Sequence, residues 1–80
     1  MITVRVRYVA VLKEKAGIES ETLETGCASA GELFETLRTR HGFKLQQKNL
    51  RVAINDQFES MAGKLRTGDE IVFIPPVAGG

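Results

Sequence analysis

Apolar and polar residues alternate with period two along residues 2–8, which read Ile-Thr-Val-Arg-Val-Arg-Tyr. This alternation is typical of a β-strand that packs one face on a core and turns the other toward water. The inward face is expected to carry Ile2, Val4, Val6 and Tyr8. The outward face is expected to carry Thr3, Arg5, Arg7 and then Val9. We therefore predict an N-terminal strand whose outer face is basic and ends on an apolar residue.

Two helices are predicted after this strand. Residues 10–16 are good helix formers and precede Gly17, which suits a short helix with a glycine after its end. The main helix follows Ser29, a favourable N-cap, and Glu32 three residues later completes a capping box. Gly42 can take the left-handed conformation that ends it. One face of this helix is apolar, through Leu33, Phe34 and Leu37.

Three further segments have strand character. Residues 21–25 are polar enough for a strand at a sheet edge, and residues 43–49 are predicted to be a polar loop. Residues 50–54 and the short return 57–59 flank an Asn-Asp turn. This order predicts a hairpin in the second half of the chain.

The last predicted strand spans residues 70–74 and follows the turn Thr67-Gly68-Asp69. Its four consecutive apolar residues indicate either a central strand covered on both faces or an exposed apolar patch. The apolar face of the main helix is buried most simply if that helix lies across a mixed sheet. We predict an α+β fold of beta-grasp architecture, with four to five strands, one main helix, and central, parallel first and last strands. The domain is placed at residues 1–74 and an extended tail at residues 75–80.

Composition and charge narrow the classes of function. The 80 residues suffice for one domain, and a net charge of +1 provides no overall field toward nucleic acid or an anionic membrane. One cysteine and one histidine exclude an intrachain disulfide and a Cys/His metal cluster. No apolar run approaches the ~20 residues of a membrane span, and no signal peptide opens the chain. We expect a cytoplasmic protein that binds no metal, nucleic acid or membrane.

The usual catalytic constellations are missing from the sequence. His41 lies at the end of the main helix, where the helix dipole favours a cation, and this structural role is the simplest interpretation. Cys27 precedes the same helix, where a helix N-terminus can activate a thiol, but a small, partly buried residue is the more ordinary role.

An apolar surface is suggested next to the basic face of the first strand. If the first and last strands are neighbours, Val9, Val72 and Ile74 form an apolar patch beside Arg5 and Arg7. Phe58 lies in the short polar return at residues 57–59, and we expect this large apolar side chain to be exposed as well. The patch is either a surface for a partner or part of a second small core.

The C-terminal segment carries the strongest functional signal. Pro75-Pro76 cannot extend a sheet ladder and favours an extended path away from it. Val77-Ala78-Gly79-Gly80 then offers side chains small enough for a narrow channel, and a terminal carboxylate. Chain ends often fray, but a rigid proline pair directly after a core strand favours a functional tail.

These segments resemble a known family, the small subunits of molybdopterin synthase, which are ubiquitin-like sulfur carriers. The resemblance is densest over residues 65–80, Leu-Arg-Thr-Gly-Asp-Glu-Ile-Val-Phe-Ile-Pro-Pro-Val-Ala-Gly-Gly, and extends to residues 10–17 and 52–55. The Gly-Asp-Glu turn followed by Pro-Pro-x-x-Gly-Gly is its most specific part. Around Arg7-Tyr8-Val9 the sequence differs from the family, where larger aromatic residues are more usual.

The resemblance implies a reaction cycle centred on Gly80, preceded by Gly79. An adenylyltransferase of the ubiquitin-activating type would use ATP to adenylate the Gly80 carboxylate, and a sulfur donor protein would convert it to a thiocarboxylate. The tail, with Pro75, Pro76, Val77 and Ala78, would enter the large synthase subunit. Its sulfur would attack cyclic pyranopterin monophosphate, leading toward molybdopterin. Catalytic side chains would belong to that large subunit, and this chain would bind no cofactor itself. Family docking positions match Val9, Phe58 and Ile74, and a basic one matches Lys13.

Three alternatives remain open at the level of sequence. The same thiocarboxylate would serve a carrier for thiamine thiazole or cysteine synthesis, although Pro75-Pro76 and the chain length favour the molybdopterin version. A ubiquitin-like modifier would instead be joined through Gly80 to lysines of target proteins. A plain interaction domain would have an inert tail.

Overall fold

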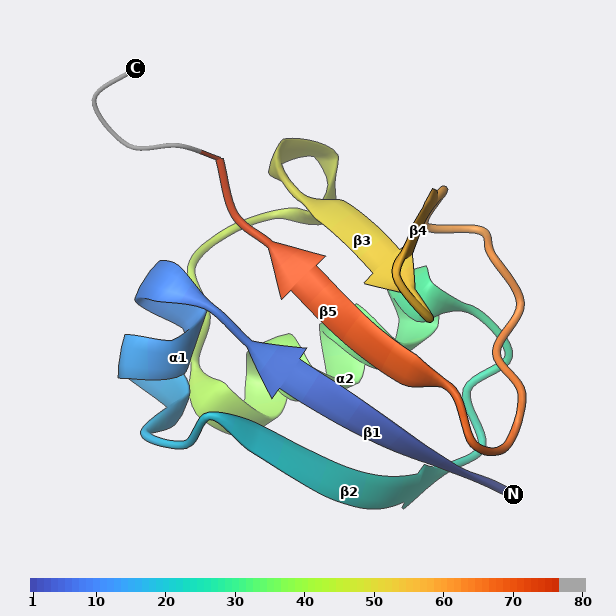
Figure 1. The fold of residues 1–80 in the computed structure, drawn as a ribbon. Helices are drawn as coiled ribbons and strands as arrows, with labels where there is room; N and C mark the ends of the chain where they lie inside the picture. Colours follow the sequence, from blue (N-terminus) through green and yellow to red (C-terminus); the bar gives the residue numbers. More distant parts are fainter. Residues whose placement is uncertain (77–80) are drawn as a thin grey trace.

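The computed structural model describes residues 1–76, and within them the chain forms a mixed sheet with helices on one side and at one end (Figure 1). The elements in chain order are β1 (Ile2–Tyr8), α1 (Ala10–Ala16), β2 (Ser20–Thr25), α2 (Ala30–His41), the 3-10 helix η1 (Gln47–Asn49), β3 (Arg51–Ile54), β4 (Gln57–Glu59) and β5 (Glu70–Ile74). The sheet order is β2-β1-β5-β3-β4. β1 and β5 are parallel neighbours, and the other pairs are antiparallel. The predicted beta-grasp architecture is confirmed, with β5 in the middle and the polar strand β2 at an edge.

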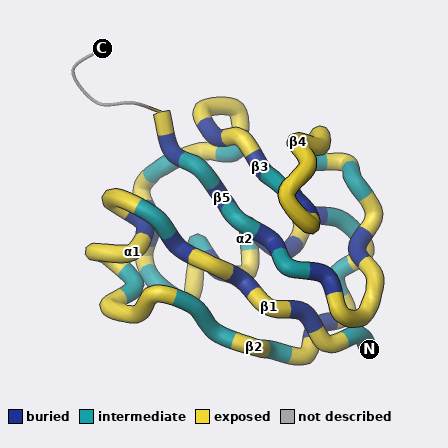
Figure 2. Tube along the Cα trace, viewed as in Figure 1, coloured by how far each residue is buried: buried dark blue, intermediate teal, exposed yellow. Residues whose placement is uncertain are grey.

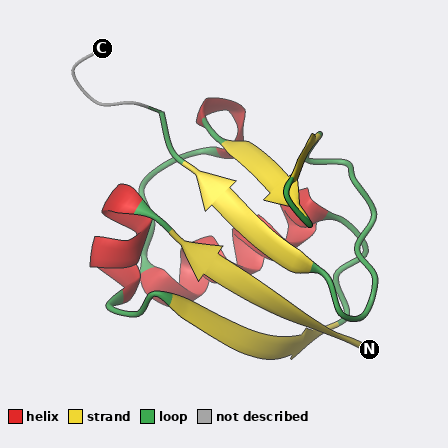
Figure 3. Cartoon of the chain, viewed as in Figure 1, coloured by secondary structure: helices red, strands yellow, loops and turns green. Residues whose placement is uncertain are grey.

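The main helix α2 forms where the capping signals predict it. The Ser29 side chain accepts a hydrogen bond from the backbone N–H of Glu32 at 3.3 Å, which satisfies one of the free donors of the first turn. Gly42 ends the helix with φ +73°, a conformation that costs a side-chain-bearing residue more than glycine. α2 passes behind the sheet in Figure 3 and buries its apolar face there, through Leu33, Phe34 and Leu37.

The alternation in β1 produces the predicted two faces. Val4, Val6 and Tyr8 are fully buried, whereas Thr3, Arg5 and Arg7 are exposed. Ile2, expected inside, is only half-buried because it opens the strand at the margin of the core. Figure 2 shows the resulting alternation of buried and exposed positions along the strand.

The prediction of a polar loop at residues 43–49 was correct for the backbone of residues 43–46 and wrong for residues 47–49 and for the side chain of Phe43. Phe43 is buried and packs its ring parallel to that of Phe34, with centroids 6.1 Å apart. Residues 47–49 form the 3-10 helix η1, and the Gln47 side-chain amide donates to the Gly31 carbonyl at 3.1 Å. The polar composition of the segment concealed one aromatic anchor whose partners lie on α2 and β1.

Residues 1–76 do not cover the strand β5 on both faces. Ile71 and Phe73 are buried beneath α2, whereas Glu70, Val72 and Ile74 are only half-buried on the opposite face. Of the two interpretations of its apolar run, the exposed patch is therefore correct.

Candidate functional site

The side of the sheet facing away from α2 is the candidate site, and we call it the outer sheet face. Strand register places one residue of each of four strands in a row across it, because Arg7 pairs with Val72, Val72 with Ala53, and Ala53 with Phe58. Val72 and Ala53 are half-buried, and Phe58 at the end of the row is 68% exposed. Side chains directly opposite one another contact each other across strands, so this row is a continuous surface. The same face also carries Arg5, Arg51, Glu70 and Ile74.

Guanidinium groups lie beside the apolar residues of this face. The Arg51 guanidinium carbon lies 5.9 Å from the centroid of the Phe58 ring, within cation–π range. Arg7 approaches the Glu70 carboxylate at 3.9 Å, and both side chains are more than one third exposed. Such a surface pair is weak, so it leaves Arg7 available to a partner. The face can therefore receive apolar side chains flanked by acidic ones.

A buried carboxylate fixes the start of β5. Asp69 accepts hydrogen bonds from the Asn55 side chain at 2.9 Å and from the Arg66 backbone N–H at 2.7 Å. The Asn55 side-chain oxygen in turn accepts from the backbone N–H of Glu70 at 3.0 Å. The Gly68 N–H donates to the Thr3 carbonyl at 2.8 Å. The Gly-Asp-Glu turn therefore ties β5 to β1 and to the β3–β4 hairpin, which sets the register of the outer sheet face.

Among the predicted docking residues, Val9 and Ile74 lie at the same end of the sheet, whereas Lys13 and Phe58 lie elsewhere. Tyr8 pairs with Phe73, so Val9 and Ile74 are the next residues at one end of two adjacent strands, and both are half-buried. Lys13 lies exposed on α1, one turn beyond Val9, and is not part of the outer sheet face. Phe58 lies on β4, at the end of the row opposite Arg7.

The proline pair follows directly after β5. Pro75 and Pro76 lie beyond the end of β5, and Pro75 is buried whereas Pro76 is exposed. The predicted tail residues Val77, Ala78, Gly79 and Gly80 lie outside the described residues.

A polar cluster that the sequence did not reveal joins β1, β2 and α2. The Glu21 carboxylate accepts a hydrogen bond from the Tyr8 hydroxyl and lies 2.9 Å from His41 Nε2. Arg40 approaches the same carboxylate at 3.5 Å. Burial tends to raise the pKa of Glu21, but the Tyr8 and His41 hydrogen bonds and nearby positive charge outweigh it, and the net pKa is lowered. Burial, followed by the hydrogen bond to Glu21, raises the pKa of Tyr8.

This cluster gives His41 a second role beside the expected one at the helix end. Glu21 lies 13 residues from Tyr8 and 20 residues from His41 in sequence, so no local spacing signal could have brought these side chains together. Cys27 is half-buried near Thr36, with the sulfur 3.6 Å from the hydroxyl oxygen.

Residues 1–76 form neither a metal-binding cluster nor a membrane-spanning helix. Over this range, His, Cys, Asp and Glu side chains form no group of three or more that could hold a metal ion. None of the helices in this part of the chain has the length and apolarity to cross a membrane.

Comparison with curated proteins gives relatives over almost the whole chain. The molybdopterin synthase sulfur carrier subunit of Haemophilus influenzae is 33% identical over 78 residues, which cover 94% of this chain and 96% of the relative. The protein of the same name from Homo sapiens is 32% identical, with 96% of this chain and 93% of the relative covered.

Solved structures share the fold. The molybdopterin converting factor subunit 1 of Pyrococcus furiosus has a TM-score of 0.80 at 28% identity, covering 96% of this chain and 100% of the other. A complex of subunits 1 and 2 of molybdopterin-converting factor from Helicobacter pylori contains a chain with a TM-score of 0.67 at 26% identity, covering 99% and 100%. The small archaeal modifier protein SAMP1 of Haloferax volcanii has a TM-score of 0.79 at 23% identity, covering 98% and 99%, which shows the fold alone.

The family model described as the ThiS family matches residues 6–80, from the middle of β1 through both terminal glycines. The relatives and this match confirm the resemblance seen in the closing segment of the sequence. The chain therefore belongs to the ThiS family.

Proposed function

We propose that this chain is the sulfur carrier subunit of a molybdopterin synthase. The observation that carries the proposal is the match to sulfur carrier subunits of that enzyme at 30–33% identity, over 94–96% of the chain. The fold supports it, because residues 1–76 leave uncovered a row that contains Val72, Ala53 and Phe58, and this row crosses the strand that leads directly to the proline and glycine pairs. A carrier needs both a surface to be recognised and an end to be loaded.

The chemistry is proposed to take place at the carboxylate of Gly80. A carboxylate is a poor electrophile at neutral pH, and adenylation by an ATP-using partner supplies a good leaving group. A sulfur donor protein then provides the sulfur of a Gly80 thiocarboxylate, which is a stronger nucleophile than the carboxylate. Gly79 and Gly80 have no side chains to obstruct a narrow channel, so the loaded end can reach a site on another protein. The chain itself binds no cofactor in this proposal.

The outer sheet face is proposed to dock the large synthase subunit, in which cyclic pyranopterin monophosphate accepts the sulfur. The Helicobacter pylori relative is known as a complex of subunits 1 and 2, which supports a two-subunit assembly. Phe58, Ile74 and Val9 supply the apolar contacts, and Arg7 and Arg51 border them. Lys13 on α1 is a further proposed contact outside the face. Activation, sulfur loading and transfer are proposed to take place in the cytoplasm.

Two other uses of the same end are distinguished by their products. A carrier for thiamine or cysteine synthesis would form the same thiocarboxylate and pass the sulfur to a different acceptor. A protein modifier would form amide bonds between Gly80 and target lysines. The likeness to SAMP1, at 23% identity, does not decide between carrier and modifier, because it shows the fold alone.

The proposal is tested by the intact mass of the chain after incubation with an activating enzyme, ATP and a sulfur donor. We expect a fraction heavier by the difference between one sulfur and one oxygen atom, localised to Gly80 by fragmentation. Localisation is essential because oxidation of a methionine adds a similar mass. Conversion of cyclic pyranopterin monophosphate to molybdopterin by the loaded chain plus large subunit then identifies the acceptor. Lysine conjugates without a thiocarboxylate would contradict the proposal.

A further inference from the structure

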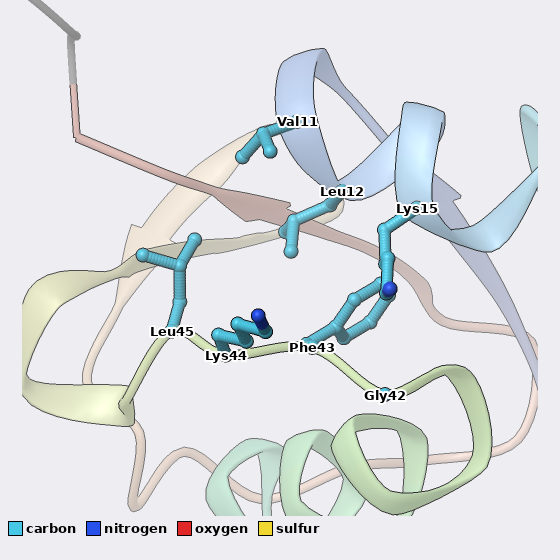
Figure 4. A pocket seen from close by; sticks show the side chains of 7 residues that line it. All are labelled: Val11, Leu12, Lys15, Gly42, Phe43, Lys44 and Leu45. Atoms are coloured by element: carbon cyan, nitrogen blue, oxygen red, sulfur yellow. The ribbon is translucent and has the colours of Figure 1, made fainter.

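A groove between α1 and the segment after α2 lies apart from the outer sheet face (Figure 4). Its floor is formed by Leu12 and Phe43, which are buried, and its rims by Val11 and Leu45. Val11 is 50% exposed, unusually open for an apolar residue at the edge of a core. The groove measures about 360 Å³, at the small end of the range typical of ligand sites.

Two lysines give the groove a positive charge. Lys15 and Lys44 both line it, and no acidic residue does. Neither ammonium group lies within 4 Å of a carboxylate of residues 1–76. The stem of Lys15 runs past Gly42, since a Cβ placed on that glycine would lie 3.6 Å from Lys15 Cε. Its ammonium group therefore lies beside the apolar floor.

We propose that this groove binds an acidic segment of a partner protein, with an aliphatic side chain on Leu12 and Phe43 and carboxylates at Lys15 and Lys44. Charge complementarity supports an acidic occupant, because two ammonium groups that no carboxylate of residues 1–76 pairs with border an apolar surface. The side chains of the groove supply only these two polar groups, both on flexible stems. A small-molecule site more often has several fixed polar groups that orient the ligand, so a peptide segment fits better. The inference rests on this geometry and is independent of the proposed sulfur chemistry.

The test is an NMR titration of the full 80-residue chain with the capped peptide Glu-Asp-Leu-Leu-Asp-Glu. We expect saturable shifts at the methyl groups of Val11, Leu12 and Leu45, which weaken as salt concentration rises. Two matched peptides, one with Ala for Leu and one with Lys for the acidic residues, are expected to cause much smaller shifts.

Variants of the chain complete the test. In the double variant Lys15→Glu/Lys44→Glu the dissociation constant of the acidic peptide is expected to rise by about tenfold or more. The exposed Lys48 lies on η1 outside the groove, so Lys48→Glu is the matched control and should leave binding unchanged. Unchanged melting temperatures of all variants would exclude unfolding as the cause.

Several outcomes would overturn the proposal. Equal shifts with the acidic and the basic peptide, no shifts up to the solubility limit, or shifts centred on Val72 and Phe58 would each do so. Tighter binding of octanoate than of the peptide would assign the groove to a small carboxylate instead. Shifts that depend on protein concentration without any peptide would assign it to a second copy of the chain.

Discussion

The side-chain amide of Asn55 donates a hydrogen bond to the buried Asp69 carboxylate across 2.9 Å, which ties together the turns at the starts of β4 and β5. The second oxygen of Asp69 accepts from the backbone N–H of Arg66. We expect Asp69→Ala to lower the free energy of unfolding by about 1–3 kcal/mol, because both donors lose their acceptor. Urea denaturation measures the change. Glu59→Ala, at an exposed position of β4, is the control, and an equal loss in both variants would contradict a specific role for Asp69.

Phe58 is expected to matter for binding but not for folding. Because its side chain is largely exposed, Phe58→Ala should change the free energy of unfolding by no more than about 0.5 kcal/mol. The same change should weaken the complex with a large synthase subunit by about 1–2 kcal/mol, as expected for an aromatic anchor of an interface. Calorimetry of the two purified subunits measures this. The control is Ile18→Ala, at an exposed apolar residue outside the outer sheet face. An unchanged affinity of the Phe58 variant would remove this residue from the docking surface.

Removal of Gly79-Gly80 is expected to abolish sulfur loading while the fold stays intact. The buried core cluster is made of residues between Val4 and Phe73, so the truncated chain keeps every core side chain. Intact-mass measurement after incubation with activating enzyme, ATP and sulfur donor should show no sulfur-containing species, and the melting temperature should be that of the full chain. Molybdoenzyme activity in a strain that carries only the truncated chain provides the cellular readout. Normal activity there would contradict the proposed role of Gly80.

The Glu21 cluster predicts a loss of stability in acid. Because the folded-state pKa of Glu21 is lowered, its contribution is present above the ordinary glutamate value of 4.5 and is lost as pH falls through the folded-state pKa. Glu21→Gln should therefore cost about 1–2 kcal/mol at pH 7 and progressively less in acid. Denaturation curves across this pH range test the prediction. Glu24→Gln, at an exposed position of the same strand, should not alter the acid profile, and a Glu21 variant with the wild-type profile would refute it.

Gly68 is expected to be required for its backbone conformation alone. Its φ is +92°, and a Cβ added there would meet no atom within 4 Å. Gly68→Ala should therefore destabilise the fold by about 1–2 kcal/mol through backbone strain and not through a clash. Thermal unfolding provides the measurement. Gly26→Ala, at a glycine without positive φ, is the matched control, and equal melting temperatures for the two variants would argue against strain at Gly68.

Short-range features of the fold were determined by the sequence alone. The period-two alternation of β1, the capping pair Ser29 and Glu32, and the closing Gly42 all act within a few residues, so their outcome can be predicted without knowing what packs against them. The strongest candidate for function, the Pro75-Pro76 and Gly79-Gly80 tail, was likewise visible in the sequence, because it consists of consecutive residues with distinctive backbone properties.

The tertiary structure decided which surfaces these elements form. Whether β5 was covered on both faces depended on where α2 packed. The row from Arg7 to Phe58 depends on how β1, β5 and the β3–β4 hairpin, which come from distant parts of the sequence, pair with one another. Phe43 joined the core, and His41 met Glu21, through contacts between segments about 10 to 35 residues apart. Local patterns fix the conformation of each element, whereas pairings between distant elements depend on the shape of the whole core, which no single stretch of this sequence contains.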